Sequence, residues 1–381
     1  MSFIQLGDVK VERGGKHIYI IAEIGQNHQG NIEIAKQLIL QAKKAGCHCV
    51  KLQKSCLRAK FTKSALDRCY DNPNSWGSSY GEHKEYLEFT LQQFDDLQKF
   101  CFDIGIDFTS SAMDEVSLKQ LDELDVPFIK IGSGDANNFL MLEKAAALNR
   151  PLIISTGMQS VKSIDAIVKI MRDANKTNYA LLHCVSSYPT EPKDCNLQMI
   201  TVMSKKYPEI VIGYSGHEIG INISKAAVVL GAKIIERHIT LDKNQKGSDH
   251  KCSLEPDELQ QMIQDINSIS LIKPIPWTQD EIINYFNNNI NITQALHGSE
   301  KRCLLACEWN CKSKLGKSIV AARDLERGRI ITKDDICIKV SEPNGIPAEC
   351  LQQIMGHSIL IDIKEDNPLM SHLFSHHIEE F

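Results

Sequence analysis

The sequence has no long apolar run and no segment typical of export. None of its apolar stretches approaches the roughly 20 residues that a membrane-spanning helix needs. Its start, MSFIQLGDVKVERGGKHIYIIAEIG, contains neither a basic n-region nor an uninterrupted apolar core, so we do not expect a signal peptide. Together these absences predict a cytoplasmic protein without a membrane partner.

Charge of one sign is not in excess either. The 381 residues include 43 lysines and arginines and 48 aspartates and glutamates, which gives a formal net charge of −5. This balance offers no general reason to expect nucleic acid or an anionic membrane as a partner. An anionic substrate would therefore need a local cluster of positive charge.

The 13 cysteines lack the even number and regular spacing of a disulfide framework. In a chain without an export signal they indicate reduced thiols in a cytosolic protein. Cys303, Cys307 and Cys311 are spaced at four, which would align them on one helix face as possible metal ligands. Because the spacing matches neither paired zinc knuckles nor iron–sulfur runs, we interpret these three as buried or incidental thiols.

Short apolar runs alternate with segments of helical periodicity through most of the chain. Near-continuous apolar strands indicate burial on both faces, as in a parallel sheet covered by helices. Eight such units fill about 255 residues, the usual size of a (β/α)8 TIM barrel. A doubly wound open sheet is the alternative, but no G-x-G-x-x-G motif follows the first strand. The expected strands lie at 17–25, 49–53, 105–111, 126–134, 150–157, 178–184, 209–216 and 232–238.

The pattern changes towards the C-terminus. Residues 276–314 are polar, rich in asparagine and weakly periodic, which is typical of a connecting segment. The residues that follow show short β-type runs divided by glycine and by turns that contain acidic residues. The sequence therefore predicts a barrel over 1–275, a linker over 276–314 and a small β-rich domain over 315–381.

Polar side chains occur at the carboxyl end of every expected strand, where a barrel of this type builds its active site. Taken singly, a serine there is usually turn chemistry, a lysine usually reaches solvent, and a histidine is usually structural. Two lysines and several hydroxyls converging on one mouth would leave positive charge without a partner, so a bound phosphate or carboxylate is expected. The residues are Glu23, Lys51, Gln53, Thr109, Ser110, Ser111, Lys130, Ser133, Asp135, Ser155, Thr156, Ser186, Ser187, Tyr188, Ser215, His217, Glu236, Arg237 and His238.

His217 and His238 end successive strands, so their imidazoles could lie within reach of one metal ion. Two histidines with carboxylate or water ligands suit a divalent Lewis acid such as Mn²⁺, Zn²⁺ or Mg²⁺. Strand alternation predicts that Glu236 and His238 point into the barrel and that Arg237 points away. We interpret Arg237 as part of a structural ion pair, and Glu236 as a residue that orients a metal ligand or reaches the ion through water.

These segments together resemble the sialic acid synthases. The matching motifs, in family order, are IAEIGQNHQG, VKLQ, IKIGSGD, ISTGM, LLHCVSSYP, IGYSGHE, ERHITLD and KGSDH. The segment LGKSIVAARDLERGRIITKDDICIKV is similar to their C-terminal antifreeze-like (SAF, β-clip) domain. The segment NSWGSSYGEHKEYLEF is similar to the animal-type enzymes.

The resemblance implies that phosphoenolpyruvate condenses with N-acetylmannosamine, its 6-phosphate or mannose 6-phosphate, and that phosphate leaves by C–O cleavage. It implies catalytic roles for Glu23, His217 and His238, and a divalent metal on the two histidines, Mn²⁺ or Mg²⁺ with Zn²⁺ or Co²⁺ as alternatives. The phosphoenolpyruvate contacts that it implies are Lys51, Ser110, Lys130, Ser133, Ser155, Ser186 and Ser215, with Gln53 near them as a further substrate-binding residue. The sugar contacts that it implies are Asp135, Tyr188 and Asp249.

One position departs from the bacterial members, in which an arginine of the small domain reaches the partner subunit's site and binds the acetamido group. Val340 stands near that position here, within IKVSEPNGIP, a texture shared with the animal-type enzymes that use phosphorylated sugars. The sequence therefore favours N-acetylmannosamine 6-phosphate as the acceptor. The family arrangement also implies a domain-swapped homodimer.

Two other functions stay open at this point. A Schiff-base aldolase would use Lys51 or Lys130 as its imine-forming amine. A sugar-phosphate-binding or ice-binding protein would bind its ligand without catalysis. Ice binding needs a flat exposed surface, whereas the antifreeze-like segment is joined here to a barrel with a polar mouth.

Overall fold

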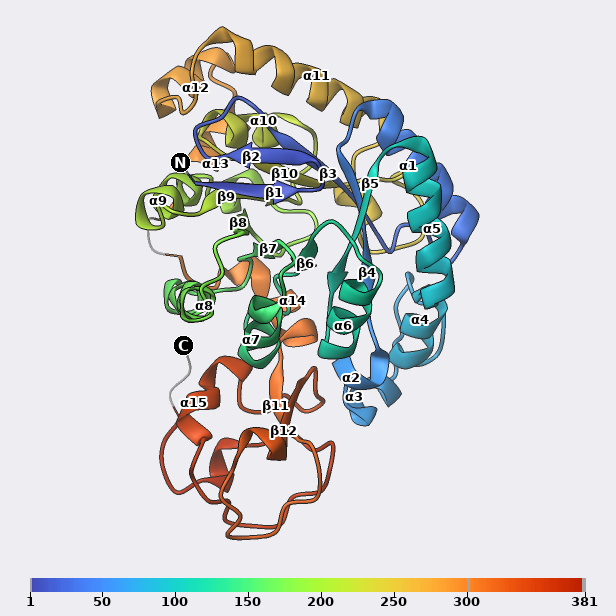
Figure 1. The fold of residues 1–381 in the computed structure, drawn as a ribbon, viewed down its shortest axis with the longest axis vertical. Coiled ribbons are helices and arrows are strands. Elements are labelled where there is room, and N and C mark those ends of the chain that lie inside the picture. The colour runs from blue at the N-terminus through green and yellow to red at the C-terminus, as the bar shows by residue number, and fades with distance from the viewer. Residues whose placement is uncertain (1, 300–301, 379–381) are drawn as a thin grey trace.

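The computed structural model describes residues 2–299 and 302–378. Residues 1, 300–301 and 379–381, which belong to the three predicted domain ranges, lie outside the described residues. A large barrel and a small domain beyond one of its ends are visible in Figure 1.

The large unit is a closed barrel of parallel strands, which confirms the predicted (β/α)8 fold and excludes the open sheet. The circle closes where β10 pairs with β3 and places His238 opposite Glu23. Because consecutive strands are neighbours all the way round, every strand end meets at one mouth. The strands are β3 (Tyr19–Gly25), β4 (Cys49–Lys54), β5 (Asp107–Ala112), β6 (Ile129–Ile131), β7 (Leu152–Ser155), β8 (Tyr179–Cys184), β9 (Val211–Gly216) and β10 (Ile234–His238).

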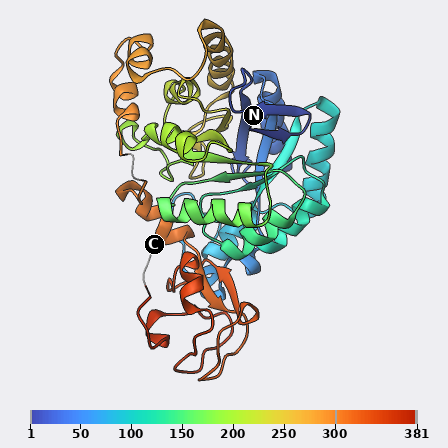
Figure 2. The same cartoon turned by 60° about the vertical axis from the view of Figure 1, so that its left-hand side comes forward.

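Helices cover the outside of the barrel (Figures 1 and 2). Local sequence sets their ends: Asn31 caps the first by accepting from two backbone N–H groups, and Gly46 ends it with a φ of 95° that favours glycine. In the described ranges no helix is both long and apolar enough to cross a membrane. The main outer helices are α1 (Ile32–Ala45), α5 (Leu91–Ile104), α6 (Glu115–Glu123), α7 (Phe139–Ala147), α8 (Val161–Asp173), α9 (Gln198–Lys206), α10 (Asn222–Val229) and α11 (Pro256–Ile272).

Apolar side chains fill the barrel interior at the amino ends of the strands. Tyr19, Cys49 and Leu182 belong to this cluster, together with Ile4 and Leu6 of an N-terminal hairpin. The hairpin consists of β1 (Phe3–Leu6) and β2 (Val9–Glu12), which the sequence pattern did not predict. With its amino end packed in this way, the barrel is open to ligands at the carboxyl ends of its strands.

In the described residues of the segment 276–314, three short α-helices occur: α12 (Gln279–Tyr285), α13 (Ile290–Leu296) and α14 (Trp309–Leu315). Ile282, Ile292 and Leu296 are buried in the core between strands and outer helices. Helices of two turns offer too few positions to show a clear period, which explains the weak periodicity of the sequence.

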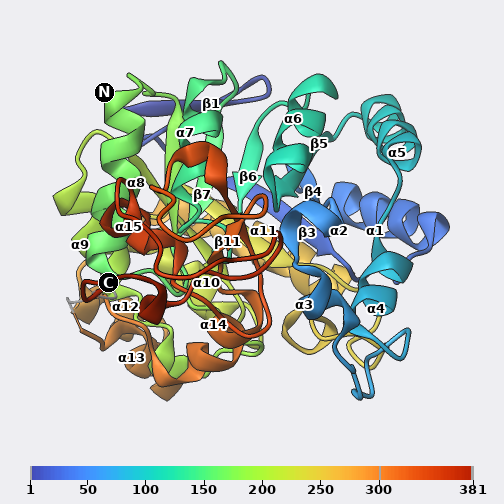
Figure 3. The same cartoon turned by 90° about the horizontal axis from the view of Figure 1, so that it is seen from below.

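The small domain lies beyond the carboxyl ends of the strands and in front of the barrel in Figure 3. It contains β11 (Ser318–Ala321) paired antiparallel with β12 (Ile336–Lys339), the short helix α15 (Leu351–Ile354), and a core of its own that includes Leu140 from α7. Three further short helices follow β4 in the chain, and the first of them contacts β12 of this domain: α2 (Leu57–Lys60), α3 (Lys63–Asp67) and α4 (Tyr80–Leu87).

Backbone hydrogen bonds seat the small domain on the barrel of the same chain. Val340 N–H donates to the Lys60 carbonyl at 2.8 Å, and Thr62 N–H donates to the Val340 carbonyl at 2.9 Å. Val340 is 1% exposed and packs with Phe61 and Tyr80. The residue near the bacterial arginine position is therefore part of a domain contact.

Arg237 confirms the interpretation of a structural ion pair. Its guanidinium is 0% exposed, lies 2.9 Å from Glu218 Oε1, and also donates to the Glu218 and Gly220 carbonyls and the Ser224 hydroxyl. It points away from the barrel interior, as strand alternation predicts. A buried charge with this many partners fixes the end of β10.

We predict that Arg237→Met destabilises the protein by about 3–5 kcal/mol, because the mutation leaves Glu218 buried without its partner. The midpoint of urea unfolding measures the effect. Arg172→Met is the matched control, since Arg172 pairs with Glu209 on the exposed surface and should leave the midpoint nearly unchanged. Equal midpoints for the two variants would contradict the structural role of Arg237.

Candidate active site

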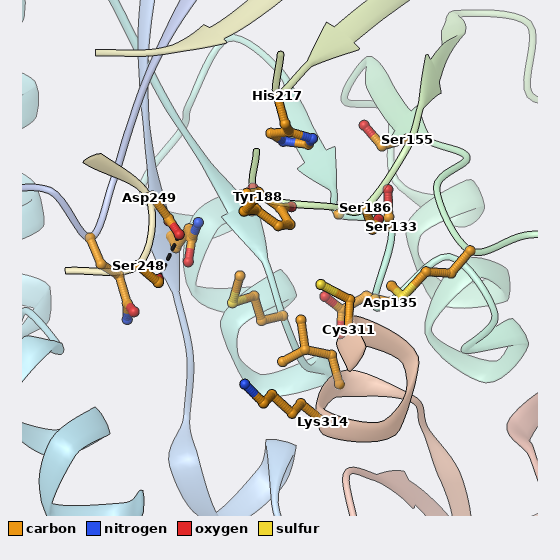
Figure 4. Close-up of a pocket in the computed structure, with 18 of the residues that line it drawn as sticks. Ser133, Asp135, Ser155, Ser186, Tyr188, His217, Ser248, Asp249, Cys311 and Lys314 are labelled. Atoms are coloured by element: carbon orange, nitrogen blue, oxygen red, sulfur yellow. Dashed lines mark hydrogen bonds between the residues drawn. The ribbon is translucent and has the colours of Figure 1, made fainter. Parts of the chain in front are cut away.

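A cavity of about 450 Å³ opens at the carboxyl ends of the barrel strands. Strand ends line its floor, and the segment between β4 and β5 together with α14 lines its outer part (Figure 4). Every residue to which the family resemblance gives a role lines this cavity except Ser110. The volume lies within the range of small-molecule sites.

Ser110 is a correction to the sequence prediction. Phe108 and Ala112, two residues before and after Ser110, point to the same side of β5 as Ser110 does. Both belong to the core under the outer helices, and Ser110 is fully buried there. Its neighbour Ser111 faces the cavity and accepts a hydrogen bond from Lys51 Nζ at 2.9 Å. Because side chains alternate along a strand, a shift of one residue moves the hydroxyl to the other face.

Two lysines and two glutamates form a buried cluster on the floor of the cavity. Lys51 Nζ lies 2.5 Å from Glu23 Oε2 and 3.8 Å from Glu236 Oε1. Lys130 Nζ lies 3.8 Å from the same Glu236 oxygen and donates to Ser155 Oγ at 2.6 Å. All four charged groups are at most 6% exposed, so they interact with little screening by solvent.

The cluster separates the pKa values of its members. Burial, aided by Glu236, raises the pKa of Glu23 despite the attraction of Lys51. Burial alone would raise the pKa of Glu236, but Lys130 and Lys51 outweigh it and lower that pKa to about 2. Glu236 is thus held as an anion, whereas the raised pKa makes Glu23 the easier of the two to protonate.

Glu236 corrects one of the two interpretations drawn from the sequence. Its hydrogen bond comes from Ser215 Oγ at 3.0 Å, and its charge faces the two lysines. It therefore compensates the lysine charges rather than orienting a metal ligand through a hydrogen bond, and a contact to an ion through water stays a prediction.

Serine hydroxyls form one wall of the cavity beside Lys130. Gly157 N–H donates to Ser133 Oγ at 3.0 Å, and Ser186 Oγ is buried without a hydrogen-bond partner among the described residues. A Cβ atom at Gly157 would collide with both hydroxyls, so the close approach of the three loops requires glycine there. The free hydroxyl and the nearby lysine can donate to an anion.

A residue of the connecting segment holds this wall in place. The Glu308 carboxylate is 0% exposed, accepts from the N–H groups of Met158 and Ser186 at 2.8 and 3.0 Å, and pairs with Arg302 at 2.7 Å. The sequence analysis missed Glu308, because nothing in a polar segment distinguishes a buried glutamate from an exposed one.

Residues 38–273 match the NeuB family, and residues 316–374 match the SAF domain. The chain belongs to the NeuB family. It is 56% identical to N-acetylneuraminate-9-phosphate synthase of Drosophila melanogaster over 353 residues, which cover 93% of this chain and 95% of the relative. It is 45% identical to the protein of the same name from Homo sapiens over 365 residues, which cover 96% and 95%. These relatives confirm the resemblance to sialic acid synthases of animal type.

Solved structures agree with the fold. The spore coat polysaccharide biosynthesis protein SpsE of Bacillus subtilis superposes with a TM-score of 0.77 at 27% identity, covering 99% of this chain and 100% of that one. The N-acetylneuraminic acid (sialic acid) synthetase of Leptospira borgpetersenii, solved with citrate, gives a TM-score of 0.62 at 33% identity, covering 75% and 96%. The predicted combination of a TIM barrel with a C-terminal SAF domain is confirmed.

The two histidines of this NeuB-family site fit a divalent metal ion. Their ring centroids lie 5.4 Å apart. His217 Nδ1 donates to the Val185 carbonyl at 2.9 Å, so Nε2 is the nitrogen that can bind an ion once the ring has lost its second proton. Burial alone would lower the pKa of His217, but the neighbouring Cys184 thiol outweighs burial and raises it, so an ion would have to displace that proton. His238 Nδ1 is buried without a hydrogen-bond partner in the described ranges, and burial lowers the pKa of that ring to about 3, so it is neutral as a ligand must be.

Histidine, cysteine, aspartate and glutamate side chains form no group of three or more placed to hold an ion in the described part of the chain. Further ligands at the histidine pair would therefore come from water or substrate. Cys303 is exposed, whereas Cys307 and Cys311 are half-buried and line the cavity, so the three thiols are not gathered as a metal site.

The predicted sugar contacts lie around the histidines and towards the outer cavity. The Tyr188 ring is 4.1 Å from the His217 ring, and Asp249 Oδ2 is 4.0 Å from His238 Nδ1. Asp135 instead forms an ion pair at 2.9 Å with Lys317 of the small domain. The sequence analysis missed further residues of the outer wall. The long insertion between β4 and β5, which carries no clear periodic signal, contributes Lys60, Tyr70, Tyr80, His83 and Lys84. Loops after β3 and β10 contribute Gln26 and Ser248, and α14 contributes Asn310 and Lys314.

We predict that His217→Ala and His238→Ala each lower the affinity for Mn²⁺ on the order of 100-fold or more, since each would remove one of the two imidazole ligands expected at this site. Titration calorimetry with Mn²⁺ measures the affinity, and circular dichroism should show an intact fold. His297→Ala removes an exposed imidazole outside the cavity and serves as the control. Wild-type Mn²⁺ affinity in both site variants would contradict the metal assignment.

Proposed function

We propose that this enzyme condenses phosphoenolpyruvate with N-acetylmannosamine 6-phosphate and water, giving N-acetylneuraminate 9-phosphate and inorganic phosphate. The observation that carries the proposal is one cavity holding two buried lysines, a wall of hydroxyls and a pair of imidazoles. The names of the Drosophila and human relatives support it. N-Acetylmannosamine and mannose 6-phosphate are the alternative acceptors.

Phosphoenolpyruvate binds on the floor of the cavity in this proposal. Lys51 and Lys130 supply positive charge, and the hydroxyls of Ser133, Ser155 and Ser186 donate to carboxylate or phosphate oxygens. A rigid arrangement of buried donors holds the substrate with C3 directed at the acceptor, which removes much of the entropic barrier to a reaction of two substrates.

A divalent ion on His217 and His238, Mn²⁺ or Mg²⁺ with Zn²⁺ or Co²⁺ as alternatives, would supply a Lewis acid for the carbonyl oxygen of the open-chain sugar. The residues of the chain position both substrates around it. Tyr188 packs against His217 at the side of the cavity where the sugar would lie (Figure 4).

Bond changes in the proposed reaction balance without a redox partner. C3 of phosphoenolpyruvate bonds to the acceptor's carbonyl carbon, whose oxygen takes up a proton, and a water oxygen bonds to C2 and loses a proton. The bond between C2 and the phosphate-bearing oxygen then breaks: the C2 hydroxyl loses its proton and becomes a carbonyl, and phosphate leaves with that oxygen and takes up a proton. Glu23, with its raised pKa and its contact to Lys51, is the group placed to accept and return a proton.

A Schiff-base aldolase is the second candidate, and one observation favours it. Burial lowers the pKa of Lys130, which would make its amine a better nucleophile. Lys51 is a poor candidate because its burial is outweighed by Glu23 and Glu236, which raise its pKa. Treatment with borohydride and pyruvate would label Lys130 in an aldolase and leave the proposed synthase unlabelled.

We predict that the protein releases phosphate from phosphoenolpyruvate only when an acceptor sugar and a divalent metal are both present. A coupled phosphate assay with N-acetylmannosamine, its 6-phosphate and mannose 6-phosphate measures the reaction and ranks the acceptors. EDTA should abolish the signal, and added Mn²⁺ should restore it. Binding of sugar phosphate without phosphate release from any pair of substrates would favour a non-catalytic binding protein.

We also propose a cytoplasmic homodimer. The family resemblance supports the dimer, and the 13 free thiols support a reducing compartment. Two backbone hydrogen bonds at Val340, the ion pair between Lys317 and Asp135 and the packing of Leu140 seat the small domain on its own barrel, and the domain of a second chain could make the same contacts.

Size-exclusion chromatography with light scattering should give a mass twice that of the 42.8 kDa chain. In the expected dimer, the small domain of each chain packs on the barrel of the other chain. A mass of one chain at assay concentration would contradict the dimer.

A further inference from the structure

The outer part of the cavity carries positive charge that its own carboxylates do not balance. Six lysines but four carboxylates line the whole cavity. On the floor Lys51 and Lys130 face Glu23 and Glu236, and in the outer wall Lys317 pairs with Asp135. The fourth carboxylate, Asp249, lies 4.0 Å from His238 Nδ1 and is also attracted by Lys84. Lys60, Lys84 and Lys314 form no ion pair within the described residues, so three lysines face this one carboxylate.

Lys60 is the most constrained of the three. It is 5% exposed, and its Nζ donates to the thioether sulfur of Met113 at 2.8 Å, which is a weak acceptor. Two nearby carboxylates are engaged elsewhere, since Asp135 pairs with Lys317 and Asp114 accepts from Ser117 N–H at the start of α6. Burial accordingly lowers the pKa of Lys60 to about 7, and a bound anion would restore its full charge.

The small domain fixes the position of Lys60. Val340 N–H donates to the Lys60 carbonyl, and the Val340 side chain packs against Phe61, the next residue. Val340 stands near the position where the resemblance places an arginine in bacterial members. In this chain Val340 of the small domain therefore holds the backbone of Lys60, and the Lys60 side chain lines the cavity.

Lys84 and Lys314 extend the positive region. Lys84 comes from α4, lies 5.5 Å from the centre of the Tyr80 ring, and donates to Gln26 Oε1 at 2.9 Å. Tyr80 also contacts Phe61, so Lys84 and Lys60 flank the same aromatic pair. Lys314 is exposed and extends from α14 on the side of the cavity opposite His217 (Figure 4).

We propose that Lys60 and Lys84, with Lys314 at the rim, form a subsite for the phosphate group of a phosphorylated acceptor sugar. The inference rests on the proposed condensation and assigns the residues that distinguish a sugar phosphate from the free sugar. A neutral sugar would leave the buried Lys60 ammonium without an anionic partner, whereas a phosphate dianion accepts from several amines at once.

The test compares kcat/KM for N-acetylmannosamine 6-phosphate and for N-acetylmannosamine at saturating phosphoenolpyruvate and Mn²⁺. In Lys60→Met and in Lys84→Gln the preference for the phosphorylated sugar should fall roughly tenfold to hundredfold, the worth of one charge-assisted hydrogen bond. Lys314→Gln should give a smaller fall, because its ammonium is exposed to solvent.

Lys63→Gln is the matched control. It removes one lysine charge three residues from Lys60, but its side chain is 86% exposed and does not line the cavity, so the preference should stay at the wild-type value. An unchanged preference in both Lys60→Met and Lys84→Gln would overturn the subsite. If circular dichroism shows that Lys60→Met does not fold, the preference is measured in Lys84→Gln alone, because Lys84 is only half-buried, and an unchanged preference there overturns the subsite.

A failure of the proposed function looks different. In that case the wild-type protein releases no phosphate with any acceptor, and calorimetry with mannose 6-phosphate replaces the kinetic comparison. Weaker binding in Lys60→Met and Lys84→Gln than in wild type and Lys63→Gln would support the subsite without the reaction. Equal binding in all four proteins would overturn it.

Discussion

Two lysine ammonium groups are buried at the centre of a barrel, and the need to compensate them shapes the rest of the site. Lys51 and Lys130 are each 2% exposed, where an isolated charge would be strongly destabilised. Glu23 and Glu236 from two adjoining strands balance them, and Ser111 and Ser155 each accept a hydrogen bond from one of the two lysines. Within this cluster burial raises the pKa of Glu23, whereas Lys130 and Lys51 outweigh burial at Glu236 and lower its pKa.

The small domain and the connecting segment complete the cavity that the barrel strands begin. Glu308 ties together two loops of the hydroxyl wall, Lys317 pairs with Asp135, and Val340 holds the backbone of Lys60. Each contact joins residues more than 100 positions apart. The outer, acceptor side of the site therefore depends on domain packing, whereas its floor depends on the barrel alone.

Local rules predicted the floor well. Buried strands in a barrel end at one mouth, so the polar residues at the strand ends could be assigned to one cavity from their positions in the chain. The same rule failed at Ser110. Thr109, Ser110 and Ser111 all carry hydroxyls, so the sequence does not show which of them point into the barrel. The N-terminal hairpin and the helices at 279–296 were missed because segments of four to seven residues are too short to show a period.

The sequence by itself determined the barrel, the small domain, the family and the identity of the charged and imidazole groups at the strand ends, since these follow from local periodicity and motifs. Only the tertiary structure decided which charges are paired. Lys51 and Lys60 are both lysines near the end of a strand or short helix, yet one has a glutamate at 2.5 Å and the other a thioether. A charge acquires its partner through distances between remote segments, and no local pattern encodes those distances.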